Sequence, residues 1–163
     1  MGFRAVVITV SDRGARGERM DGSGPEIAGM LLAMGMEIVG RQIIPDEKEL
    51  IHQALIDWSD GGKTDLILTT GGTGMSPRDV TPDATREVVD REVPGMAEAM
   101  RHQSLTVTPH AMLSRAMAGI RGRTLIINLP GSPKGARENL NVILPALVHA
   151  IEKIKGDEKE CAS

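Results

Sequence analysis

Short apolar runs alternate along the chain with segments in which apolar residues recur every three or four positions. A run of about four to eight apolar residues between polar or glycine positions is typical of a buried strand. We expect strands at Arg4–Val10, Glu37–Ile44, 65–70 and 125–129, with a shorter candidate at 115–120.

The segments between these strands show helical spacing. Ile27, Met30, Leu31 and Met34 form one apolar stripe, and Gly35 is its expected stop. Further helices are expected at 51–58, 82–89, 95–105 and from residue 133 through residue 154. Alternating strands and helices predict an α/β domain with a three-layer, mainly parallel, Rossmann-like sheet and helices on both faces. We assign residues 1–155 to this single domain and residues 156–163 to a charged, flexible tail.

Length and composition narrow the possible partners. A chain of 163 residues is one domain with room for a real core. The net charge is −3, and Phe3 and Trp58 are the only aromatic residues, which argues against nucleic acid, anionic membrane and base-stacking surfaces. Cys161 is the only cysteine, and no apolar run approaches the roughly 18 residues of a membrane span. We therefore expect a cytoplasmic protein without disulfides.

A glycine-rich loop after the third apolar run is the most informative chemical signal. Gly71, Gly72 and Gly74 surround Thr73, and Asp79 follows just before a helix start. Glycines let backbone N–H groups approach an anion, and a nearby carboxylate can hold the Mg²⁺ that neutralises it. The loop matches neither a Walker A motif nor a dinucleotide fingerprint. A glycine turn alone is more often only a tight turn, but together with Asp79 it favours a phosphate-and-metal site.

Other loops at the same edge of the sheet carry weaker signals, because ligands of such sheets bind beyond the carboxyl ends of the strands. A capping box with Glu49 fully explains Asp46, so a functional role rests on its place beside the glycine loop. Thr81 is the expected N-cap of the helix after Asp79. The segment 128–133 is a second anion-site candidate, although simple capping by Ser132 explains it about as well.

Catalysis by a side-chain nucleophile has little support. The histidines show no metal-ligand spacing, and the chain contains no G-x-S-x-G motif. A carboxylate with Mg²⁺ facing phosphates is typical of phosphoryl or nucleotidyl transfer, in which positioning and charge neutralisation provide most of the catalysis.

Short motifs spread over nearly the whole chain give a more specific indication. They are TVSDR (9–13), IPDE (44–47), TTGGTG (69–74), RDVTPDAT (78–85), DREVPG (90–95), LSR (113–115) and NLPGSP (128–133). Together and in this order they resemble the MogA/MoaB family of molybdenum cofactor biosynthesis. That family also supplies the G domains of plant and animal molybdenum-insertion proteins.

The resemblance implies a homotrimeric protein that binds molybdopterin, a dithiolene pterin phosphate. In the MogA branch, AMP passes from ATP to that phosphate with Mg²⁺, and pyrophosphate is released. Asp46 and Asp79 match the catalytic, metal-associated pair of this branch. The other positions that match the substrate and nucleotide site are Ser11, Gly71, Gly72, Thr73, Gly74, Ser104, Asn128, Pro130, Gly131 and Ser132.

Two other functions stay open at this point. A non-catalytic, MoaB-like molybdopterin-binding or scaffold protein has the same fold, and some such proteins lack the aspartates. The third possibility, a regulatory nucleotide-binding domain, has less support, because the chain has few aromatic residues on which adenine would stack. The resemblance also makes other molybdenum cofactor biosynthesis proteins candidate partners.

Overall fold

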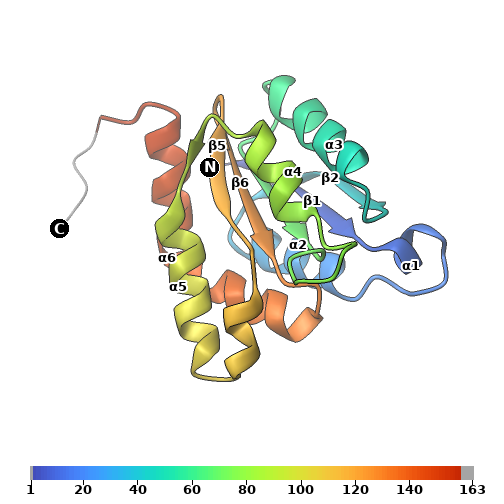
Figure 1. Cartoon of the computed structure of the whole chain (residues 1–163). Helices are drawn as coiled ribbons and strands as arrows, with labels where there is room; N and C mark the ends of the chain where they lie inside the picture. Colours follow the sequence, from blue (N-terminus) through green and yellow to red (C-terminus); the bar gives the residue numbers. More distant parts are fainter. Residues whose placement is uncertain (1, 159–163) are drawn as a thin grey trace.

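The computed structural model describes residues 2–158 and is built on a six-stranded sheet with the order β2-β1-β3-β6-β5-β4 (Figure 1). The first four strands in this order run parallel, and β5 and β4 run antiparallel at one edge. The mainly parallel sheet predicted from the sequence is therefore confirmed. The strands are β1 (Arg4–Val10), β2 (Glu37–Ile44), β3 (Leu66–Thr70), β4 (Arg91–Glu92), β5 (Ala118–Arg121) and β6 (Thr124–Leu129).

Helices cover both faces of the sheet (Figure 1). Alternate residues of each central strand point to opposite faces, so Val7 and Leu68 lie in one core while Ile8 and Ile67 lie in the other. The first core is closed by α2 (Ser23–Ala33), α5 (Pro94–Leu105) and α6 (Pro133–Ile154). The second is closed by α3 (Lys48–Asp60) and α4 (Thr81–Val88). No helix among residues 2–158 is long and apolar enough to cross a bilayer.

The sequence missed three short elements, which are α1 (Asp12–Ala15), β4 and the 3₁₀ helix η1 (Pro109–Leu113). Each is too short to produce a hydrophobic period. The long helix α6 continues through Pro145 as predicted. Pro145 is exposed, so water can satisfy the carbonyl group that proline leaves without a donor. The predicted tail lies partly outside the described residues, and Cys161 lies wholly outside them.

The predicted helix starts have different outcomes. Ser132 caps α6, and its Oγ accepts a hydrogen bond of 3.1 Å from the N–H of Gly135. The capping box of Asp46 is wrong, because the N-cap of α3 is Glu47 and no side chain caps that helix. Thr81 is the first residue of α4 rather than its N-cap, and its buried Oγ1 has no hydrogen-bond partner. Asp46 and Thr81 therefore need another explanation.

Candidate functional site

Two clefts lie beside the loops that follow the carboxyl ends of the parallel strands. We call the first, with a volume of about 470 Å³, the acidic cleft, and Asp21, Asp46 and Asp79 are among its lining residues. We call the second, of about 290 Å³, the apolar cleft, and Val107 and Leu113 are among its lining residues. This is the edge at which ligands bind in open α/β sheets.

The glycine loop separates the two clefts. Gly71 and Gly72 line the acidic cleft, whereas Thr73 and Gly74 line the apolar cleft. The φ angles of Gly71 and Gly72 are +105° and +68°, which favour glycine. A Cβ on Gly71 would lie 2.2 Å from the carbonyl oxygen of Val10. The loop therefore requires glycine for its own path, besides any ligand.

Part of the expected anion cradle is already occupied. The N–H of Gly71 donates to the carbonyl oxygen of Leu129 over 3.1 Å. The N–H groups of Gly72, Thr73 and Gly74 donate to no residue in the described part of the chain. Because main-chain donors are normally paired, these three N–H groups are the ones that can receive phosphate oxygens.

Asp46 follows β2 and faces the glycine loop. Its Oδ2 accepts a hydrogen bond of 2.9 Å from the N–H of Asp12, and its own N–H donates to Asp12 Oδ1 over 3.0 Å. Its Oδ1 accepts no hydrogen bond from any residue in the range 2–158. A Cβ built on Gly72 would lie 3.1 Å from this oxygen and 2.3 Å from the unpartnered Oγ1 of Thr81. Glycine at position 72 thus leaves room where two oxygen atoms lack partners.

The electrostatic surroundings of Asp46 and Asp12 differ. Burial raises the pKa of Asp46, and the charges of Asp12 and Asp79 add to this effect. The Asp12 carboxylate accepts hydrogen bonds from Arg78 of 2.8 and 3.0 Å, which lower its pKa. Arg78 therefore pairs with Asp12 and leaves the Asp46 carboxylate without an arginine hydrogen-bond partner among the described residues.

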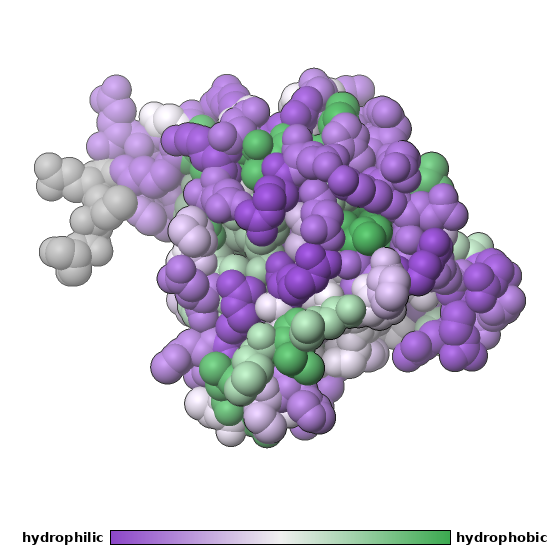
Figure 2. Space-filling model, viewed as in Figure 1, coloured by the Kyte–Doolittle hydropathy of each residue, from purple (hydrophilic) through white to green (hydrophobic). Residues whose placement is uncertain are grey.

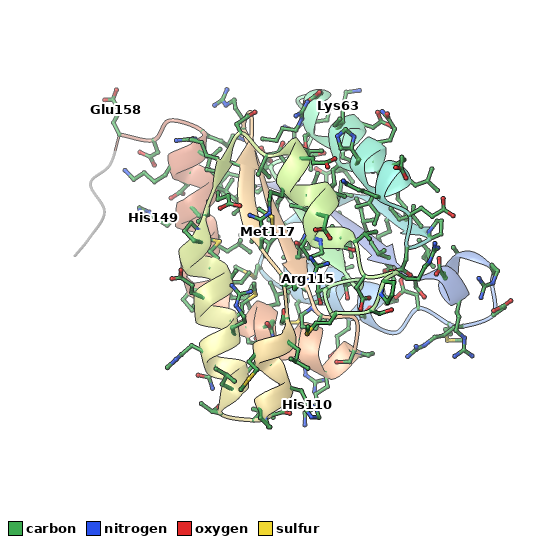
Figure 3. All side chains as sticks on the ribbon, in the orientation of Figure 1. Lys63, His110, Arg115, Met117, His149 and Glu158 are labelled. Atoms are coloured by element: carbon green, nitrogen blue, oxygen red, sulfur yellow. The ribbon has the colours of Figure 1, made fainter. Side chains whose placement is uncertain are left out.

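Asp79 lines the same cleft as Asp46 and lies beside the other end of the glycine loop, near Gly74. Its Oδ2 accepts a hydrogen bond of 2.9 Å from the N–H of Ser76, and a Cβ on Gly74 would approach this oxygen to 2.8 Å. Arg115 supports the loop from outside and donates to the carbonyl oxygens of Gly74 and Asp79 over 3.0 and 2.5 Å (Figure 3). Backbone contacts thus hold the loop that carries Asp79.

The second predicted anion loop, between β6 and α6, packs directly against the glycine loop. Thr70 Oγ1 donates to the carbonyl oxygen of Pro130 over 2.6 Å, and a Cβ on Gly131 would lie 3.2 Å from the Cα of Gly71. Ser132 lines both clefts, while its Oγ caps α6. Ser132 therefore both caps α6 and lines the site.

Nearly all of the residues predicted for the site gather at these two clefts. The acidic cleft includes Ser11, Asp46, Gly71, Gly72, Asp79, Gly131 and Ser132. The apolar cleft includes Thr73, Gly74, Ser104, Pro130 and Ser132. Their order along the chain gives little hint of this division, which arises because the glycine loop runs between the clefts.

Asn128 is the exception, and its placement as a cleft residue needs correction. The side chain is fully buried, and its Nδ2 donates to the hydroxyls of Thr69 and Thr85 over 3.0 Å each. Its Oδ1 accepts from the N–H of Met117 over 3.2 Å. Asn128 therefore joins β3, α4 and the approach to β5 from inside the protein, and it lines neither cleft.

Among the residues around the clefts that the sequence did not predict as site residues are Asp12, Asp21, Arg78 and Ser114. Asp21 accepts from Thr9 Oγ1 and from the N–H of Gly24, which places it at the start of α2. Ser114 lines the apolar cleft. Asp12, Arg78 and Ser114 lie within motifs that carry the family resemblance, so these motifs could have indicated them as site residues.

The acidic cleft is not a complete metal cage. No three His, Cys, Asp or Glu side chains between residues 2 and 158 gather closely enough to hold a metal ion. Asp46 and Asp79 nevertheless supply the hard oxygen donors that Mg²⁺ prefers, and Asp46 Oδ1 is free to bind. The donor set fits an ion that shares its coordination with substrate phosphates, as Mg²⁺ commonly does.

Comparisons with known proteins agree with this geometry. Residues 6–149 match the family described as "Probable molybdopterin binding domain". The chain belongs to the MogA/MoaB family. It is 44% identical over 154 residues to the molybdopterin adenylyltransferase of Helicobacter pylori, which covers 93% of this chain and 87% of that protein. The crystal structure of the molybdopterin biosynthesis enzyme MoaB from Thermus thermophilus is 54% identical, with a TM-score of 0.90 and coverage of 95% and 98%.

The family also includes larger proteins. Gephyrin of Dictyostelium discoideum is 47% identical to this chain over 163 residues, which cover 94% of this chain. The chain spans only 23% of gephyrin, so it corresponds to one part of that protein.

Proposed function

We propose that this chain is a molybdopterin adenylyltransferase, which transfers AMP from ATP to the phosphate of molybdopterin and releases pyrophosphate. The observation that carries the proposal is the arrangement of Asp46 and Asp79 around one cleft. Both lie beside a loop with unpaired N–H groups, and a second, apolar cleft lies on the other side of that loop. The names of relatives such as the Helicobacter pylori enzyme support the same activity.

The proposed reaction forms one bond and breaks one. A phosphate oxygen of molybdopterin attacks the α-phosphorus of ATP, and the bond between that phosphorus and the oxygen bridging to the β-phosphate breaks. The electron pair of the broken bond leaves with pyrophosphate. Because the attacking phosphate is already anionic at neutral pH, the site needs no strong general base.

The residues around the acidic cleft then have definite tasks. The N–H groups of Gly72, Thr73 and Gly74 orient phosphate oxygens. Asp46 and Asp79 would hold Mg²⁺, which supplies the positive charge that offsets repulsion between the two anionic substrates. Val107 and Leu113 in the apolar cleft suit a flat heterocycle of one substrate.

A direct assay tests this function. Purified protein is incubated with molybdopterin, ATP and Mg²⁺, and adenylylated molybdopterin and pyrophosphate are measured. Formation of both products in equal amounts is the expected result. Binding of molybdopterin without AMP transfer would instead support the MoaB-like scaffold function, which the paired aspartates make the weaker candidate.

We also propose that the protein is a homotrimer and acts in the cytoplasm with other molybdenum cofactor biosynthesis proteins. Figure 2 shows apolar side chains gathered over the end of α5 and the following segment, where Leu105 and Met112 are exposed and line neither cleft. Such a patch is typical of an interface. Met112 belongs to this patch, whereas Met100 and Met117 from the same part of the chain are buried within the single chain and add nothing to it. Light scattering at micromolar concentration measures the mass directly.

A further inference from the structure

Asp12 contacts more of the site than its position at the start of a four-residue helix suggests. Its N–H and its carboxylate form the reciprocal pair of hydrogen bonds with Asp46. The same carboxylate accepts from Nε and NH2 of Arg78, which immediately precedes Asp79. One side chain therefore joins the loops that follow β1, β2 and β3.

Only a carboxylate can satisfy all of these donors. Asp12 Oδ1 accepts from both the N–H of Asp46 and the guanidinium of Arg78, while Oδ2 accepts a further guanidinium N–H. An asparagine has one acceptor oxygen and one NH₂ group, so it would point a donor at a donor. The backbone N–H of Asp12 donates to Oδ2 of Asp46, which leaves Oδ1 of Asp46 toward Gly72.

We propose that Asp12, held by Arg78, is a positioning residue that fixes the backbone at Asp46 and so sets the place of the Asp46 carboxylate relative to Asp79. This inference rests on the proposed function. Asp12 acts through Asp46 and touches neither substrate. Loss of its carboxylate removes the bridge between the Asp46 N–H and Arg78, so the loops after β2 and β3 can separate and carry Asp46 away from Asp79, while the apolar cleft stays intact.

The expected kinetic signature is specific. Misplacement of reacting groups by about 1 Å can cost roughly 100-fold in rate, so Asp12→Asn and Asp12→Ala should lower kcat by about that factor. Affinity for molybdopterin, measured by calorimetry, should change less than about twofold, because Asp12 lines neither cleft. Arg78→Gln should have a smaller effect of the same kind, and Arg78→Lys should recover part of it.

A matched control is available at the other end of the sheet. Asp60 accepts two hydrogen bonds of 2.8 Å from Arg121, which resembles the Asp12–Arg78 pair without any contact to the clefts. Asp60→Asn should leave kcat unchanged. A crystal structure of Asp12→Asn gives a readout that does not need activity, and it should show Asp46 displaced relative to Asp79.

Several results would overturn the proposal. They are a kcat of Asp12→Asn within about threefold of Asp60→Asn, an unmoved Asp46 in the crystal, or a loss of molybdopterin affinity as large as the loss of kcat. A rise in KM for ATP in Arg78→Gln alone would show that Arg78 binds substrate instead. If Asp12 variants fail to fold, the Arg78 variants carry the test. An inactive wild type would reject the proposed function, and the position of Asp46 relative to Asp79 in the crystal would still test the role of Asp12.

Discussion

Carboxylates at the two ends of the sheet meet opposite surroundings. At the amino ends of the strands, Asp65 is 4% exposed and accepts hydrogen bonds of 2.8 Å from the N–H of Arg4 and from Lys155 Nζ. At the carboxyl ends, Asp46 accepts a single hydrogen bond from a backbone N–H and lies near the charges of Asp12 and Asp79.

The pKa values of these groups move accordingly. Burial opposes ionisation of Asp65, but the Arg4 N–H and the Lys155 ammonium outweigh it and lower its pKa. Burial and like charges raise the pKa of Asp46. A carboxylate whose partners are complete stabilises the fold, whereas one left with an unpaired oxygen costs stability and is available to a ligand.

We expect the largest loss of activity from substitutions in the acidic cleft alone. Asp46→Asn and Asp79→Asn should each reduce AMP transfer by about 100- to 1,000-fold, because each removes a charge that faces the phosphates but keeps the shape. Molybdopterin affinity should stay close to wild type by calorimetry. Asp57→Asn, on the exposed face of α3, is the control. Near-normal turnover in both site variants would reject the catalytic pair.

Removal of divalent cations should separate activity from stability. EDTA should abolish AMP transfer, because two carboxylates bind Mg²⁺ well only together with substrate phosphates. The melting temperature of the free protein should change by less than about 1 °C, since the described residues contain no cluster that would hold a structural metal. Unfolding in EDTA, or undiminished transfer, would contradict the role assigned to Mg²⁺.

The glycine loop offers a test of intermediate size. Gly72→Ala should weaken substrate binding by roughly tenfold, because the new Cβ meets Thr81 Oγ1 and fills the space beside Asp46. Gly62→Ala is a matched control, since its φ of +63° is as unfavourable for alanine but nothing lies within 4 Å of the new atom. Thr73→Val should have a smaller effect through loss of its hydroxyl. Unchanged affinity in folded variants would argue against a phosphate cradle.

The sequence predicts the elements of the fold better than it predicts the contacts of individual site residues. The hydrophobic period and the glycine stops are local signals, and β1 and β2 have the bounds that these signals predict. The parallel direction of the central strands follows from their alternation with helices. The glycine loop was recognisable because its conformation depends on the local chain. These are the parts of the fold that neighbouring residues determine.

The contacts of individual polar residues were not predictable in the same way. Asp46 has a good local explanation as a helix cap, yet its carboxylate bonds to Asp12, which lies 34 positions away in the chain. Asn128 was expected at the ligand because of its motif, but Thr69 and Thr85 hold it inside the protein. Such choices depend on tertiary packing, which a one-dimensional pattern does not contain.

The smallest effects that we expect are changes in stability, and they compare the carboxylates at the two ends of the sheet directly. Asp65→Asn should lower the free energy of unfolding at neutral pH by about 2 kcal/mol, because it removes a buried charge from Lys155. Since the pKa of Asp65 is lowered on folding, this contribution is present at neutral pH and is lost as pH falls through the folded-state value. The wild type and Asp65→Asn should therefore converge in stability in acid.

Asp46→Asn should not lower the free energy of unfolding as Asp65→Asn does. At neutral pH its stability should equal or slightly exceed that of the wild type, by no more than about 0.5 kcal/mol, because the amide oxygen still accepts from the N–H of Asp12 and an unfavourable charge is gone. Urea unfolding of both variants in EDTA measures the pair under one condition. If Asp46→Asn destabilises the protein as much as Asp65→Asn does, Asp46 is an ordinary structural carboxylate, and the contrast between the two ends of the sheet disappears.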